Sequence, residues 1–213
     1  MKKVISLLFI GLIVCNCKKG VNVPLSFDFG SIENGIYDNT FFKFKFPVNP
    51  DWYILDNNET DRLYEIGNEV ASGDNESLKK TLDASQINLA KLFTAFREQP
   101  GTNISFNPSI IINAENLKNS LTIKTNSDYL IQAKKLLAQT QMQIEFIEEK
   151  DKVKIGSQNF GFIKLENTLE TGEVVTQDYY YTLKEGFVLL IIMSYVEDEG
   201  KTEVYNMFNK LKI

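Results

Sequence analysis

The chain has 213 residues, of which 43% are hydrophobic and 24% charged, the composition of an ordinary globular protein with room for one domain. Its 28 acidic and 23 basic residues give a formal net charge of −5, so attraction to nucleic acid or to an anionic lipid surface is not expected. The chain has no histidine, and its two cysteines are Cys15 and Cys17. Histidine-dependent nucleophiles, His/Cys zinc sites and disulfides beyond residue 17 are therefore excluded.

The first element in chain order is an apolar leader. Lys2 and Lys3 form a basic head, residues 4–14 are an apolar run, and the chain turns polar at Lys18. This is the pattern of a secretory signal, and the run falls short of the roughly 20 apolar residues that a membrane-spanning helix needs. A cysteine at the end of such a run resembles the lipid acceptor of bacterial lipoproteins.

We therefore expect a lipoprotein signal peptide at residues 1–16 and a lipidated tether at residues 17–31, the lipid being a fatty acid such as palmitate. An uncleaved membrane anchor is the alternative. The usual lipobox has a small residue before the cysteine, and neither candidate has one. Asn before the acceptor and lysines after it resemble some bacterial lipoproteins, so we predict lipid attachment at Cys17, with Cys15 as the alternative.

The predicted domain covers residues 32–213 and begins with two strands. Phe42, Phe44 and Phe46 alternate with lysines, which places the three rings on one face of a strand. A turn with two prolines follows, and residues 52–55 are predicted as the return strand. Trp52 is predicted to pack in the core against the phenylalanine face, rather than to stack on a ligand.

Two helices are expected next. Asn58 is the predicted N-cap of the first, which runs to Ser72–Gly73, and the second runs from about residue 74 to Leu82. The acidic stretch 56–61 does not have the spacing of an EF-hand calcium loop, because Asp61 stands where that loop needs glycine.

The middle of the chain alternates strands and one helix. Residues 87–98 are predicted as a strand, although their apolar spacing also fits a helix, and residues 109–112 as a β-branched strand. An amphipathic helix is expected from a cap at Ser127–Asp128. Short strands at 143–147 and 153–155 are predicted to be joined by a solvated charge run.

The last third is predicted as a meander of strands at residues 160–166, 174–183 and 187–195. The final strand of the three is apolar on both faces, so it should be central and covered on both sides. Acidic residues 197–199 then start a C-terminal amphipathic helix. In the run Tyr179–Tyr180–Tyr181, we expect Tyr180 on one face and its neighbours on the other, rather than a ring-lined cleft.

This order of elements resembles the PsbP-like family. The resemblance rests on Tyr37-x-Asn39, on Phe42-x-Phe44-x-Phe46-Pro47 with Trp52 after it, on the strand 186–189 and on the short C-terminal helix ending at residues 211–213. It implies an α+β fold, an antiparallel β-sheet flanked by helices in an α/β/α sandwich. Members of the family are non-enzymatic binding or assembly subunits, so the resemblance implies no catalytic residue here.

The sequence thus predicts a membrane-tethered lipoprotein of the bacterial cell envelope, with its domain outside the cytoplasm, acting as a binding or assembly module. We expect membrane contact through the lipid, a protein partner and no nucleic acid, and the sequence points to no catalytic, cofactor-binding or metal-binding residue. The alternative is an envelope hydrolase that uses paired Asp/Glu carboxylates. Two carboxyl groups about 5–9 Å apart in an aromatic-lined cleft would favour it.

Overall fold

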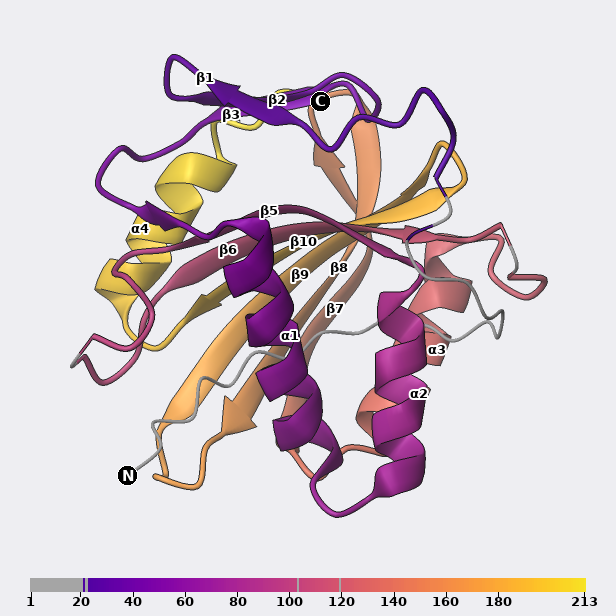
Figure 1. Cartoon of the computed structure of the whole chain (residues 1–213), viewed down its shortest axis with the longest axis vertical. Helices are drawn as coiled ribbons and strands as arrows, with labels where there is room; N and C mark the ends of the chain where they lie inside the picture. The colour runs from indigo at the N-terminus through magenta and orange to yellow at the C-terminus, as the bar shows by residue number, and fades with distance from the viewer. Residues whose placement is uncertain (1–20, 22, 103, 119) are drawn as a thin grey trace.

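A computed structural model of the chain describes residues 21, 23–102, 104–118 and 120–213. The expected signal peptide, Cys15, and residues 17–20 and 22 of the expected tether, among them Cys17, lie outside the described residues. Within the described part, a seven-stranded antiparallel sheet has helices on both of its faces (Figure 1). The predicted α+β fold with a flanked antiparallel sheet is therefore confirmed. None of the described helices combines the length and the apolar character needed to cross a membrane.

The large sheet has the strand order β4-β5-β6-β10-β9-β8-β7, and every neighbouring pair is antiparallel. All nine residues of the central strand β10 are buried, as its doubly apolar pattern predicted. The strands are, in chain order, β4 (Tyr53–Ile54), β5 (Leu89–Phe96), β6 (Ser109–Asn116), β7 (Gln143–Ile155), β8 (Gln158–Thr168), β9 (Val174–Lys184) and β10 (Phe187–Tyr195).

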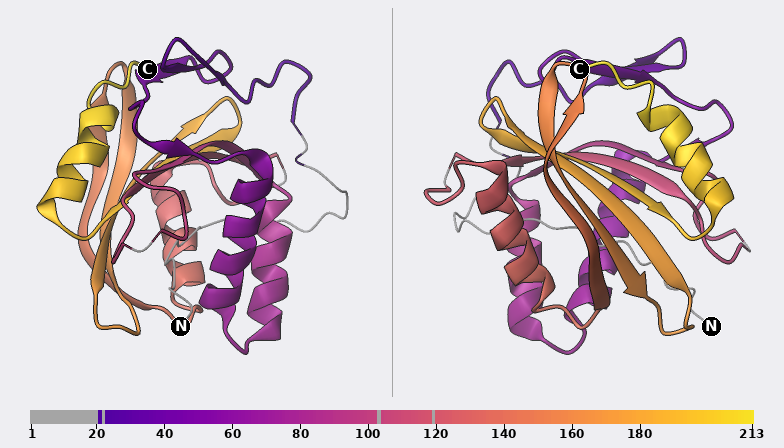
Figure 2. Two further views of the ribbon diagram at one scale, coloured as in Figure 1. Left: turned by 60° about the vertical axis from the view of Figure 1, so that its left-hand side comes forward. Right: turned by 180° about the vertical axis from the view of Figure 1, so that it is seen from behind.

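Three helices cover one face of the large sheet: α1 (Asn57–Ser72), α2 (Glu76–Gln86) and α3 (Asn126–Leu137). Figure 2 shows them together on the side away from the C-terminal helix. Their apolar stripes pack on the alternate residues of the strands, and Tyr179 and Tyr181 belong to this core. Tyr180 belongs to the core of the opposite face, so the predicted alternation of the three tyrosines is confirmed.

The opposite face is covered by α4 (Asp198–Phe208) and by a separate three-stranded sheet of β1 (Ser31–Glu33), β2 (Ile36–Asn39) and β3 (Phe44–Pro47). Phe42, Phe44 and Phe46 all lie in the core between the two sheets, as their alternation predicted. Trp52 is 6% exposed and belongs to the same core.

The prediction that residues 52–55 return alongside the phenylalanine strand is wrong. Only Tyr53 and Ile54 form a strand, and β4 pairs with β5 of the large sheet, opposite Phe96 and Ala95. Pro47 and Pro50 lack the N–H groups that a hairpin ladder would need, so the chain crosses from the small sheet to the edge of the large one.

Two predicted helix starts are also corrected. Asp56 caps α1, not Asn58, because its carboxylate accepts the amide of Glu59 while the Glu59 side chain accepts the Asp56 amide. Thr125 caps α3 in the same way, together with Asp128, so that Ser127 lies inside the helix. The N-terminus of α2 is capped by Asn75, close to the start expected near residue 74.

The charge run at residues 148–152 is not a loop. It lies inside β7, a continuous strand of 13 residues at the edge of the large sheet. The ladder with β8 shifts register between Phe146 and Glu148 and again between Lys150 and Val153. Charged side chains and bulges are common on edge strands, where they discourage pairing with another chain. The charge run is therefore compatible with a strand at the edge of the sheet.

Candidate functional site

A hollow lies where four segments meet: the N-terminal segment, the first turn of α1, the end of α2 and β5. Its volume is about 730 Å³. A smaller hollow of about 220 Å³ shares Gly30, Asn57, Thr60, Lys91 and Leu92 with it and continues past Ile32 and Ile54. We call the two together the α1–β5 groove, lined in its larger part by Val21, Phe29, Gly30, Asn57, Thr60, Asp61, Asp83, Gln86, Ile87, Leu89, Lys91 and Leu92. Its volume is in the range of small-ligand sites.

The wall formed by the N-terminal segment is fixed by hydrogen bonds. The Asp28 carboxylate accepts the Gly30 amide at 2.8 Å and both the amide and the hydroxyl of Thr40 at 2.7 Å. Burial raises the pKa of Asp28, but the donors of Thr40 and Gly30 outweigh it and hold that pKa below its usual value.

Gly30 is required where this wall meets the small sheet. The Tyr37 hydroxyl donates to the Phe29 carbonyl at 2.8 Å, so the tyrosine passes directly beside the glycine. Gly30 has a φ of +85°, and a Cβ at that position would stand 2.3 Å from the Tyr37 hydroxyl oxygen. Only glycine both adopts this positive φ and leaves room for the Tyr37 hydroxyl. Gly30 therefore keeps the wall of the groove in place.

Among the described residues that line the groove, Lys91 is the one cation. The Lys91 side chain is 18% exposed and its Nζ lies 2.5 Å from an Asp61 carboxylate oxygen. The same Nζ stands 4.3 Å from the centre of the Tyr64 ring, a cation–π contact. Lys91 is thus held between α1 and β5, with its charge facing the groove.

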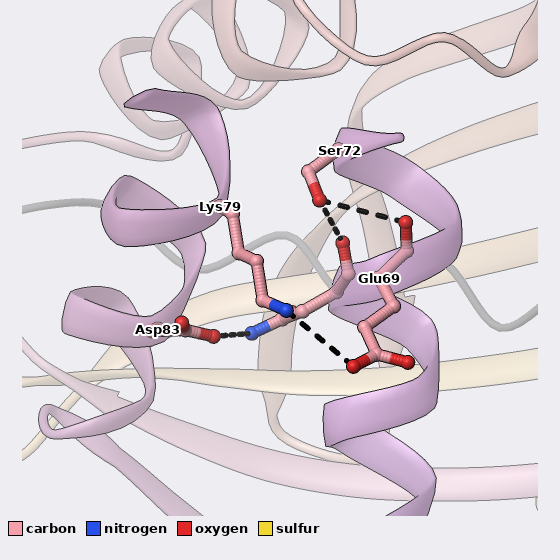
Figure 3. A network of polar contacts seen from close by, with 5 residues as sticks. Glu69, Ser72, Lys79 and Asp83 are labelled. Atoms are coloured by element: carbon pink, nitrogen blue, oxygen red, sulfur yellow. Dashed lines mark hydrogen bonds and ion pairs between the residues drawn. The ribbon is translucent and has the colours of Figure 1, made fainter. Parts of the chain in front are cut away.

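The second carboxylate of the groove, Asp83, is held by α1. The Asn68 side-chain amide donates to Asp83 at 2.9 Å, and Lys79 forms an ion pair with Glu69 at 3.4 Å, as Figure 3 shows. Asn68 is 4% exposed, so the donor side of this bond is buried, whereas Asp83 itself is exposed. The contacts join α1 to α2 and fix the far wall of the groove.

The chemistry of the groove is amphipathic. Val21, Phe29, Leu89 and Leu92 supply apolar surface, and Asn57, Thr60, Gln86, Asp61, Asp83 and Lys91 supply polar groups. Each of the two carboxylates has a partner inside the protein, Lys91 for Asp61 and Asn68 for Asp83. Within the described residues, no group of three or more His, Cys, Asp or Glu side chains is arranged to hold a metal ion.

This groove has no local signature in the sequence, since its residues come from segments as far apart as Val21 and Leu92. The one available signal was Lys91, a lone cation inside the apolar strand 89–93. Tyr179, Tyr180 and Tyr181, the residues considered as a possible cleft lining, are buried in the two cores and do not line the groove.

A second polar cluster lies under α4, away from the groove. Asp178 on β9 is fully buried and accepts hydrogen bonds from Tyr195 at 2.8 Å and from Tyr205 of α4 at 2.6 Å. Lys164 Nζ lies 3.8 Å from its other oxygen. Burial, and then the Asp178 carboxylate, raise the pKa of both tyrosines, so they remain protonated donors. The cluster fastens α4 to the sheet.

No protein-family model matches this chain, and no curated protein matches it in sequence. Among solved structures, it is similar to the PsbP protein CyanoP of Synechocystis sp. PCC 6803, with 14% identity and a TM-score of 0.47, over 94% of this chain and 98% of that one. It is also similar to LpqN of Mycobacterium tuberculosis, which is involved in cell envelope biogenesis, with 17% identity and a TM-score of 0.43, over 80% and 82% of the two chains. A third is PA94 of Pseudomonas aeruginosa, of unknown function, with 12% identity and a TM-score of 0.38, over 56% and 74%. A PsbP is thus among the similar structures.

Proposed function

We propose that this protein is a lipoprotein of the cell envelope that is anchored at Cys17 and binds its partner, without catalysis, in the α1–β5 groove. The observation that carries this proposal is the position of the groove, because Val21, only four residues after Cys17, forms part of its lining. An extended chain covers at most about 3.6 Å per residue, so the groove would lie within about 14 Å of the lipid anchor. A partner in or on the same membrane would be within its reach.

The proposal favours binding over hydrolysis because of the groups that line the groove. Asp61 is paired with Lys91 and Asp83 is bonded to Asn68, so each carboxylate already makes a contact that holds the walls of the groove. Ligand sites with a mixed lining of apolar surface and a few fixed polar groups are typical of recognition.

The anchor is tested by labelling. A metabolically supplied radioactive fatty acid is expected to label the wild-type protein and Cys15→Ala but not Cys17→Ala, because only the acceptor thiol forms the lipid linkage. Label in Cys17→Ala and its loss from Cys15→Ala would move the anchor to Cys15. An unlabelled wild-type protein would refute the lipoprotein assignment.

The groove is tested by filling it. Asn57 is exposed and lines both parts of the groove, whereas its neighbour Asn58 is exposed and lines neither. With a photo-reactive amino acid at Gln86, illumination of whole envelopes should give a covalent adduct. We expect Asn57→Trp to weaken partner binding, and hence adduct yield, by tenfold or more, equivalent to about 1.4 kcal/mol.

Asn58→Trp is the matched control and should leave the adduct unchanged, since it adds the same ring one residue away. The same photo-reactive amino acid at Gln139, an exposed position after α3, should give no such adduct. Equal yields from the two tryptophan variants would show that the partner does not occupy the groove.

A further inference from the structure

Exposed apolar side chains are concentrated near the start of the described chain. Ten large apolar residues are exposed in the described part, and four of them fall between residues 25 and 36. Leu25 is fully exposed, and Phe29, Ile32 and Ile36 are 41–47% exposed. Single exposed apolar residues are ordinary on a protein surface, whereas a group of them marks a contact with another apolar partner.

The fold holds Leu25 and Ile36 away from the core. Leu25 lies in a turn closed by the bond from the Phe27 amide to the Pro24 carbonyl, at 3.0 Å. The Phe27 ring packs against the core, with its centre 4.8 Å from that of the Phe41 ring and 5.2 Å from that of the Phe187 ring. The turn is therefore fastened to the core while Leu25 points away from it.

Ile32 and Ile36 stand on opposite faces of the β1–β2 hairpin: Ile32 is opposite Tyr37 and lines the smaller hollow, whereas Ile36 is on the outer face of the hairpin. Its ladder pairs Glu33 with Ile36 across a tight turn in which Asn34 and Gly35 have φ values of 52° and 73°. Below this hairpin lie Tyr37 and Phe46, which are 2% exposed. The small sheet and the N-terminal segment together form one end of the molecule, at the top of Figure 1.

The charges around these residues have both signs. Glu33, Asp38, Lys43 and Lys45 are exposed in the same segment, and Asp28 is engaged by Thr40 and Gly30. This mixture offers no net attraction to an anionic surface. Any attraction to lipid must therefore come from the apolar side chains, which makes it insensitive to salt.

The length of the tether limits how far these residues can lie from the membrane that holds the anchor. Leu25 is eight residues after Cys17, so even a fully extended tether keeps it within about 29 Å of the anchor, and Val21 within about 14 Å. We propose that Leu25, Phe29 and Ile36, which we call the bilayer face, insert their side chains into the lipid–water interface of the membrane that holds the anchor. This inference rests on the lipid attachment in the proposed function. Phe29 also lines the groove, so its rim would lie at the interface.

The test uses the mature lipidated protein in phosphatidylcholine–phosphatidylglycerol vesicles. Removal of the signal peptide takes away Cys15, and acylation consumes the Cys17 thiol, so one introduced cysteine is the only reactive one. Leu25→Cys and Ile36→Cys are labelled with a fluorophore and exposed to phospholipids that carry a nitroxide quencher at the interface. The matched control is Ile131→Cys, which is 53% exposed on α3.

We expect the labels at Leu25→Cys and Ile36→Cys to lose most of their fluorescence, at low and at high salt, and the label at Ile131→Cys to keep its fluorescence. Equal quenching at all three positions, or quenching that disappears in high salt, would overturn the bilayer face. Flotation with the vesicles separates the two proposals. Protein that floats without quenching at Leu25→Cys and Ile36→Cys contradicts the bilayer face alone, whereas protein that does not float contradicts the anchor.

Discussion

Replacing Asp178 with alanine is expected to lower the free energy of unfolding by about 3–5 kcal/mol, the usual cost of removing one partner from a buried charged contact. The carboxylate is fully buried and accepts the hydroxyls of Tyr195 and Tyr205. Its removal leaves the Tyr195 hydroxyl without its acceptor and the Lys164 ammonium without its nearest anion. Because Tyr205 belongs to α4, the C-terminal helix should lose protection from hydrogen exchange first.

Urea unfolding of Asp178→Ala beside two controls tests this expectation. Asp178→Asn keeps the size and one acceptor oxygen and should cost less than the alanine variant. Glu170→Ala removes an exposed carboxylate from the loop before β9, so the free energy of unfolding should change by no more than about 0.5 kcal/mol. A midpoint for Asp178→Ala within error of the wild type would show that the cluster does not hold α4.

Trp52→Ala is expected to destabilise the protein by about 3–5 kcal/mol, because it empties a large site in a close-packed core. Trp52 is 6% exposed and lies between the small sheet and the large one, in the same core as Phe44 and Phe46. The chain passes from one sheet to the other at this point, so few neighbours can move to fill the cavity.

Thermal or urea unfolding measures the loss, and Leu121→Ala provides the surface comparison. Leu121 is 86% exposed, so its truncation should change the free energy of unfolding by no more than about 0.5 kcal/mol. Trp52→Phe should fall between the two, since it keeps part of the ring volume. If Trp52→Ala unfolds at the wild-type midpoint but fails to bind its partner, the indole is a contact residue and not a core residue.

Several elements could be predicted because their residues carry the whole signal. The alternation of phenylalanines with Lys43 and Lys45 fixes which face of that strand is buried, whatever lies opposite. The doubly apolar strand 187–195 must be central, since both of its faces need cover. Tyr180 and its two neighbours divide between the two cores for the same reason, a side-chain period of two.

Other features were mispredicted because neighbouring elements compete with local preference. Both Asn58 and Asp56 are good N-cap residues, and the reciprocal bond to Glu59 selects Asp56. The charge run 148–152 looks like a loop in isolation, but the ladder with β8 extends it as a bulged edge strand. Likewise the strand after Trp52 finds its partner in β5, since the prolines before it prevent a hairpin.

The sequence by itself determined the class of fold, the absence of histidine and thiol chemistry beyond residue 17, and the leader pattern on which the proposed anchor rests. These follow from composition and from periods of two and 3.6 residues, which are local properties of the chain. Only the tertiary structure decided where a partner could bind. Lys91 meets Asp61 across 30 positions, and Gly30 meets the start of α1, because the pairing of β5 and the packing of the N-terminal segment bring them together. Contacts at such separations leave no periodic trace in the sequence, so the groove exists only once the sheet and its covering helices have formed.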